Sequence, residues 1–218
     1  QSRPRLFLVA FRPDAAGRLG QGGVDPVWTP PALVRAVAQL PPAIRSAWRW
    51  LPLPAPPRRN TDLADLVEAN PTGVEWHSAA ETAAILALMA PTNLAKIEAE
   101  KLTGRRSVGT IFRRTRPHAD GGTRQRAEAR FDGLAGCLRT PAGGSSRQTL
   151  IVVEGETVRT RLLSPREAAR LMGLADDYIL PPRLNPALHL LGDGVAVPAV
   201  RFLAAHVLEP LCAELEPV

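Results

Sequence analysis

The chain has 218 residues, 45% of them hydrophobic, which suffices for one large domain or two small ones. Its formal net charge is +6 and only two of its 27 basic residues are lysine, a bias that suits nucleic-acid binding and is equally typical of a GC-rich genome. Two cysteines, Cys137 and Cys212, support neither a disulfide framework nor a zinc site, and no apolar run reaches the roughly 18 residues of a membrane span. We therefore expect a cytoplasmic protein without a metal.

The first residues, QSRPRLFLVAF, join a basic start to a continuous apolar run. Such a run predicts a strand covered on both faces, as in a parallel α/β sheet. One strand cannot form a sheet, so its neighbours are expected elsewhere. Because the chain starts at Gln1 directly on this strand, we expect it to be a piece of a longer protein.

Residues 12–59 are rich in glycine and proline, which predicts loops around one short helix at 32–40. Residues 51–60, LPLPAPPRRN, predict a polyproline-like connector. Further helices are predicted at 61–69, 78–90 and 93–102. Ser78 and Glu81 have the spacing of a capping box at the start of one of them.

Residues 101–130 carry nine basic side chains against Asp120 and Glu128, so the charge excess is local. We interpret this segment as a glycine-containing loop anchored through 108–112 that faces DNA phosphates; a solvated, disordered loop is the alternative. The candidate DNA-binding residues in it are Arg105, Arg106, Arg113, Arg114, Arg116, Arg124 and Arg126.

Downstream, FDGLAGCLRTPAGGSSRQ (131–148) sets turn formers beside arginines and small hydrogen-bond donors. The β-rich runs 149–153 and 157–163 meet around Glu154–Gly155, which predicts a hairpin. A helix should follow, with Ser164 as N-cap, Glu167 closing a capping box and Gly173 ending it. The last elements expected are a short helix at 187–191, a glycine turn at 192–195 and a helix from 198 to about 211.

The string at 161–178, RLLSPREAARLMGLADDY, resembles motif IX of the cytosine-5 DNA methyltransferases. The opening QSRPR before its apolar run resembles motif VIII, and GDGVAVP at 192–198 resembles motif X. A string similar to LRTPAGGSSRQ lies just before motif IX in one branch of the family, within its target-recognition region. That likeness adds the DNA-contact candidates Arg139, Thr140, Ser145, Ser146, Arg147 and Gln148.

The resemblance implies a mixed α+β fold. A target-recognition domain of short helices, loops and a β-hairpin would be joined by one strand and a C-terminal helix that complete the α/β sheet of an S-adenosylmethionine-dependent methyltransferase. The implied parts are a catalytic-domain strand at 1–11, the target-recognition domain at 12–160, the motif IX scaffold helix and connector at 161–191, and the motif X loop and helix at 192–218.

The resemblance also implies residue roles. Arg5, supported by Arg3 and Gln1, would help to hold a flipped cytosine and its phosphate. The segment Gly192, Asp193, Gly194 and Val195 would form part of the cofactor site, although Asp193 departs from the commoner Asn. Arg161, Ser164, Arg166, Glu167 and Arg170 would fix the scaffold by ion pairing and capping rather than touch the base.

Three family motifs are missing from the sequence: the Pro-Cys nucleophile, the Glu-Asn-Val motif and the F-x-G-x-G cofactor loop. We therefore expect the DNA-recognition half of a cytosine-5 methyltransferase, inactive alone, which acts on double-stranded DNA with an N-terminal catalytic half in the same or a separate chain. A bacterial, nucleoid-associated enzyme of a restriction-modification system fits this reading. The alternatives are a catalytically inactive DNA-binding fragment and a sequence-specific DNA-binding regulator.

Overall fold

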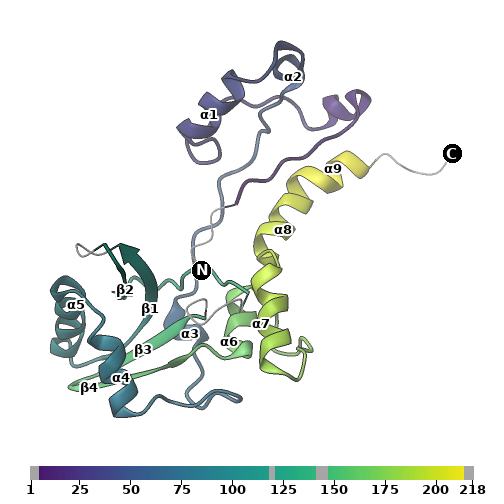
Figure 1. Cartoon of the computed structure of the whole chain (residues 1–218). Helices are drawn as coiled ribbons and strands as arrows, with labels where there is room; N and C mark the ends of the chain where they lie inside the picture. The colour runs from purple at the N-terminus through teal and green to yellow at the C-terminus, as the bar shows by residue number, and fades with distance from the viewer. Residues whose placement is uncertain (1–4, 118–120, 141–146, 214–218) are drawn as a thin grey trace. The chain divides into compact units, whose positions relative to one another are not determined.

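The computed structural model describes residues 5–117, 121–140 and 147–213, apart from the side chains of Ala16 and Arg116 (Figure 1). Its contacts divide the chain into two compact units. The larger unit comprises Gln1–Arg5 and Asn60–Pro198, and the smaller one Leu6–Arg59 and Ala199–Val218. Because the placement of one unit relative to the other is not determined, each is described by itself.

A four-stranded antiparallel sheet of order β2-β1-β3-β4 forms the centre of the larger unit. Its strands are β1 (Arg106–Pro117), β2 (Thr123–Arg130), β3 (Thr149–Glu154) and β4 (Thr157–Leu162). The helices of this unit are α3 (Leu63–Leu66), α4 (Ala79–Leu86), α5 (Pro91–Leu102), α6 (Pro165–Leu171) and α7 (Leu184–Asp193). The chain is therefore a mixed α/β protein, as the sequence predicts.

Two hydrophobic clusters lie on opposite faces of the sheet, because successive side chains of a strand point to opposite sides. Leu150 and Val152 of β3 face the cluster that α3, α6 and α7 complete. Ile151 and Val153 face the second cluster, which α4 and α5 cover. All four side chains are at most 1% exposed, so β3 is the buried centre of the unit.

The hairpin of β3 and β4 confirms the sequence-based prediction. Glu154 pairs with Thr157, so Gly155 and Glu156 form a two-residue loop. Gly155 has a φ of 54°, the conformation that such tight hairpin loops require and that glycine adopts without strain. The capping box of Ser78 and Glu81 at α4 is also present.

The segment predicted as a basic loop is instead a second hairpin. β1 and β2 pair from Thr110–Arg130 out to Pro117–Thr123. The loop prediction is wrong because the segment contains a short alternation, typical of strands, that places Ile111, Ala127 and Ala129 on one face. The many arginines and glycines around these residues obscure that pattern. These three residues anchor the hairpin on α5, which is why the charged remainder is ordered.

Helix α6 begins and ends as predicted. Ser164 Oγ accepts a hydrogen bond from Glu167 N at 3.1 Å, and Ser164 N donates to the Glu167 carboxylate at 2.8 Å. Gly173 follows the C-cap with a φ of 76°. The bonds from Gly173 N to Arg170 O (2.9 Å) and from Leu174 N to Ala169 O (3.0 Å) form a Schellman motif.

A buried ion pair joins α6 to β4 and to the segment after α3. Both Arg161 and Glu167 are 0% exposed, and Arg161 donates two hydrogen bonds to the Glu167 carboxylate, at 2.5 and 2.8 Å. Glu167 also accepts from Glu68 N at 2.8 Å, while Arg161 donates to Glu68 O at 3.0 Å. The Trp76 ring lies 4.9 Å from the Arg161 guanidinium. The two opposite charges thus compensate each other, as a buried pair requires.

The smaller unit holds the 3₁₀ helix η1 (Pro13–Arg18), the helices α1 (Pro31–Ala38) and α2 (Pro42–Ala47), the π-helix η2 (Ala204–Leu208) and α9 (Glu209–Cys212). Its contacts include the bond from Arg18 Nη1 to Leu211 O at 2.7 Å. Trp28 stacks on Phe202 with a centroid separation of 5.2 Å.

The strand predicted at residues 6–11 is not present. Residues 5–11 have no regular secondary structure, and Leu6 and Leu8 are 62% and 70% exposed. An apolar run becomes a buried strand only where another strand takes up its backbone N–H and C=O groups. No described residue forms such a ladder with this segment.

The C-terminal helical region also departs from the sequence-based expectation. α8 (Val197–Leu203) runs on into η2 and α9, so the predicted helix begins earlier and changes to a π-helix at 204–208. Of its apolar residues Val200, Leu203, Ala204, Val207 and Leu211, only Val207 is buried. By length and composition the run Leu184–Cys212 is suited to cross a membrane, which the sequence did not predict. Residues 194–196 interrupt it, and composition alone does not establish a span, so a location away from membranes stays a prediction.

Replacing Glu167 by alanine should reduce the free energy of unfolding by about 3–5 kcal/mol, because Arg161 would be left buried and unpaired. Urea denaturation followed by circular dichroism measures the change. Asp176→Ala, which removes the exposed partner of Arg170, is the matched control and should change stability little. Equal losses in the two variants would contradict the central role of the buried pair.

The same carboxylate should make stability depend on pH. Burial alone raises the pKa of Glu167, but hydrogen bonds from Arg161 and from the backbone N–H groups of Ser164 and Glu68 outweigh it and lower that pKa below its ordinary value of 4.5. A depressed pKa stabilises the fold above the unfolded value, and this contribution is lost as pH falls through the folded value. Wild-type stability should therefore fall more steeply below pH 4.5 than that of Glu167→Gln. Parallel urea-midpoint curves from about pH 7 to about pH 3 would contradict this.

Candidate nucleic-acid interface

Arginine occupies two successive cross-strand pairs of positions in the outer half of the β1–β2 hairpin. The register places Arg114 opposite Arg126 and Arg116 opposite Arg124. We call these two cross-strand pairs the arginine ladder. Arg114, Arg124 and Arg126 are exposed. Their face continues that of Phe112 and Glu128, opposite the face that packs on α5.

A groove of about 400 Å³ opens beside the inner part of this face. Strands β1 and β2 form one wall and the loop before β3 forms the other. Its lining residues include Lys96, Arg113, Arg114, Arg130, Arg139 and Arg147, with Glu128 as the acidic residue among them. Gly136 lies so close to the Phe112 ring that a Cβ there would overlap it. The groove is thus a strongly cationic surface with an aromatic floor.

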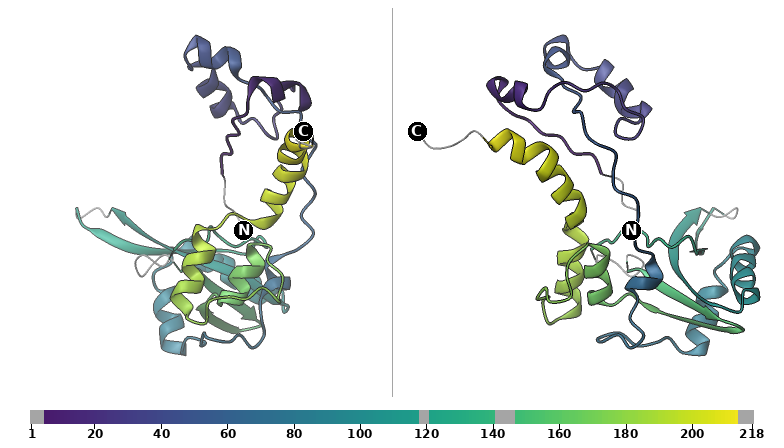
Figure 2. Two further views of the ribbon diagram at one scale, coloured as in Figure 1. Left: turned by 90° about the vertical axis from the view of Figure 1, so that its right-hand side faces the viewer. Right: turned by 180° about the vertical axis from the view of Figure 1, so that it is seen from behind.

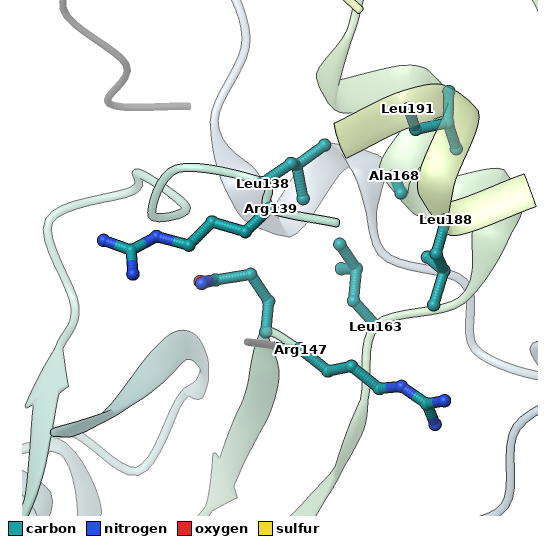
Figure 3. Close-up of a pocket in the computed structure, with 8 residues that line it drawn as sticks. Leu138, Arg139, Arg147, Leu163, Ala168, Leu188 and Leu191 are labelled. Carbon is teal, nitrogen blue, oxygen red and sulfur yellow. The ribbon is translucent and has the colours of Figure 1, made fainter. Parts of the chain in front are cut away.

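The loop that carries Arg139 and Arg147 is held by α7. A Cβ on Gly192 would lie 2.5 Å from Thr140 N and 2.6 Å from the Arg139 carbonyl carbon. Arg147 donates to Asn185 Oδ1 at 2.6 Å. Beneath the loop, Leu138, Leu163, Ala168, Leu188 and Leu191 line a small apolar cavity, and Figure 3 shows the guanidinium groups of Arg139 and Arg147 pointing away from it in opposite directions.

The structure separates the remaining candidates. Arg105 and Arg106 lie at the opposite end of β1, about 36 Å along the strand from its tip, and Arg106 pairs with Glu154 at 3.2 Å. Arg5 is exposed. Gln1, Arg3, Ser145 and Ser146 lie outside the described residues. The arginines predicted from charge to bind DNA therefore lie on two separate surfaces. One is the groove with the arginine ladder, and the other is the distant end of β1, where Arg106 pairs with Glu154.

Two other scaffold candidates, Arg166 and Arg170, hold the chain that follows α6. Arg166 donates to Ala175 O at 3.3 Å and to Tyr178 O at 3.0 Å. Arg170 forms a two-bond ion pair with Asp176, at 2.7 and 2.8 Å. The hydrogen bonds from Arg170 lower the pKa of Asp176. All these contacts are with protein groups.

The residues of the motif X string do not form the predicted loop. Gly192 and Asp193 complete the last turn of α7, and Gly192 packs against the Arg139–Thr140 backbone. Asp193 and Val195 are exposed, while Gly194 is half-buried. The bond from Val197 N to Met172 O, 2.8 Å long, ties this segment to the end of α6.

Sequence reasoning missed several groove residues. Lys96 of α5 donates to Ala129 O at 3.0 Å, and Arg130 of β2 lies 5.9 Å from the Phe112 ring centroid while pairing with Asp132. The pairing lowers the pKa of Asp132. The alternation along β1 and β2 is the sequence signal that predicts the position of Arg130. Within the described ranges no cluster of histidine, cysteine, aspartate and glutamate is suited to a metal.

Comparison with known proteins gives partial relatives. Type II methyltransferase M1.ScrFI of Lactococcus lactis subsp. cremoris is 38% identical over 61 residues, 28% of this chain and 16% of that protein. Type II methyltransferase M.HpaII of Haemophilus parainfluenzae is 33% identical over 95 residues, 37% of this chain and 26% of that protein. Type II methyltransferase M.SsoII of Shigella sonnei is 34% identical over 61 residues, again 28% and 16%.

This chain thus matches only a minor part, 16 to 26%, of the length of these curated relatives. The model of the C-5 cytosine-specific DNA methylase family, in contrast, matches residues 1–209. Since that match covers almost all of the 218 residues, the chain belongs to the C-5 cytosine-specific DNA methylase family.

Proposed function

We propose that this chain is the DNA-recognition part of a DNA (cytosine-5-)-methyltransferase that acts on double-stranded DNA. The observation that carries the proposal is the cationic groove, which brings Arg139 and Arg147 of the loop beside Arg114 of the hairpin. Arginine binds phosphates and reads guanine edges bidentately, and glutamine reads adenine. Arg139, Arg147 and Gln148 line the groove and are its proposed base contacts.

The proposed reaction is methylation of C5 of a cytosine flipped out of the duplex. The family nucleophile is a cysteine that follows proline, which matches neither Cys137 nor Cys212. A catalytic segment outside these residues, in the same or a separate chain, therefore has to supply the thiolate that adds to C6. Arg5, with Arg3 and Gln1, has the proposed role of holding the flipped nucleotide. The Arg5 side chain is exposed.

S-Adenosylmethionine supplies the methyl group in this proposal. The residues present fit its site only in part. Asp193 and Val195 are exposed and are available to form a wall of the site, together with Gly194. Gly192 faces the Arg139–Thr140 backbone and has the proposed role of holding this segment in place.

The chain alone should transfer no methyl group from labelled S-adenosylmethionine to DNA, and activity should appear once the catalytic segment is supplied. In that assembly, Arg5→Ala should lower the transfer rate by about 100-fold while changing DNA affinity little, because it mispositions the reacting base. Arg12→Ala, which removes an exposed arginine paired with Asp14, is the control. Methyl transfer by the chain alone would refute the assignment of the nucleophile to another segment.

The absence of a Pro-Cys pair from this sequence also fits a second function, that of a sequence-specific DNA-binding regulator. A regulator binds its site independently of the catalytic segment and of S-adenosylmethionine. Electrophoretic mobility shifts with each component added in turn distinguish the two functions.

Replacing Gly192 by alanine should displace the loop that carries Arg139 and Arg147, which we call the recognition loop. The new Cβ would overlap backbone atoms of Arg139 and Thr140, which cannot rotate away as a flexible side chain can. We expect a loss of about 1–3 kcal/mol in unfolding free energy, as in an overpacked core, and weaker DNA binding. Gly23→Ala is the matched control, since nothing lies within 4 Å of a Cβ at that position. Unchanged stability and DNA affinity in Gly192→Ala would show that α7 does not position the loop.

A further inference from the structure

We propose that the arginine ladder is a sequence-independent phosphate clamp, which grips the duplex backbone while the groove reads the bases. This inference rests on the proposed function, since it assumes that duplex DNA is the partner. It assigns different tasks to neighbouring arginines: the outer ladder residues Arg124 and Arg126 set affinity, and the groove, which Arg114 also lines, sets sequence preference.

The first argument is the cross-strand register. Residues directly opposite each other in an antiparallel pair lie about 5 Å apart. Arg114 lies opposite Arg126, and the next same-face pair along the strands is Arg116 and Arg124. The register therefore places arginine positions of both strands close together on one face of the hairpin. Such a face attracts a partner with a regular row of negative charges.

The second argument is that the described side chains of this outer part of the hairpin are exposed. Pairing between β1 and β3 ends at Ile111 and Thr149, so beyond this point β1 pairs only with β2. Figure 2 shows the two strands projecting there past the rest of the sheet. The described side chains at 123–126 are all exposed. Core packing therefore does not explain why arginine occupies these positions.

The third argument is that Arg124 and Arg126 are not placed for reading bases. Base reading requires side chains held in fixed positions at a shaped surface, as in the groove. Arg124 and Arg126 are outside the groove lining. They are two residues apart on one strand, so they share a face with a spacing of about 6.7 Å. Exposed guanidinium groups in such a row suit the repeating charge of a phosphate backbone and carry no base information.

The test compares the 218-residue chain with Arg124→Gln/Arg126→Gln. Fluorescence anisotropy with a labelled duplex of about 30 base pairs gives the salt dependence of binding, and selection from a pool of duplexes with a random centre gives the preferred sequence. The slope of log K against log salt should become less steep by about 1.8, since each lost phosphate contact removes about 0.9. The preferred sequence should stay the same.

Two further variants make the outcome decisive. Arg124→Lys/Arg126→Lys should keep the wild-type slope, because a phosphate requires charge and not a bidentate fork. Arg35→Gln/Arg45→Gln, which removes the same charge from exposed positions in α1 and α2, should also leave the slope unchanged. An unchanged slope in the ladder glutamine variant, or a changed preferred sequence in either ladder variant, overturns the clamp while the proposed function stands. If the wild-type chain binds no duplex, the proposed function fails and this inference fails with it.

Discussion

The buried pair of Arg161 and Glu167 is the interaction on which the larger unit depends. An unpaired charge in a protein interior is very costly, so the two side chains are stable there only together. Their hydrogen bonds tie the end of β4 to the first turn of α6 and to the backbone of Glu68. Three segments far apart in the sequence therefore meet at one point, and the geometry of that point sets the direction of α6.

The recognition loop is supported in turn through α6 and α7. Ala168, Ala169 and Leu171 of α6 lie in the same cluster as Leu191 of α7. Helix α7 holds the loop at Gly192 by backbone packing and at Asn185 by a hydrogen bond to Arg147. The groove beside that loop therefore depends on a helix that contributes no groove-lining residue itself.

Features specified by neighbours in sequence were predicted well. The capping box of Ser164 and Glu167 and the turn at Gly155 each depend on a few consecutive residues, so their signals are local. Features that need a distant partner were predicted poorly. The sequence of the β1–β2 hairpin predicts a loop because the described side chains of its outer half are exposed. The apolar run at 6–11 predicts a strand, but a strand requires backbone hydrogen bonds to a neighbouring strand, and no described residue supplies them. The target-recognition boundaries at 12 and 160 stay a prediction.

Short windows of the amino-acid sequence suffice to predict the family resemblance, the capped helix α6, the β3–β4 hairpin and the local excess of arginine. The three-dimensional fold is needed to show which arginines act together. Antiparallel pairing places Arg114 beside Arg126 and separates both from Arg106 by most of the length of β1. The loop before β3 brings Arg139 to the groove that Arg114 also lines. The physical reason is that charge is a property of single residues, whereas a binding surface requires charges brought together by strand register and by packing against a buried core.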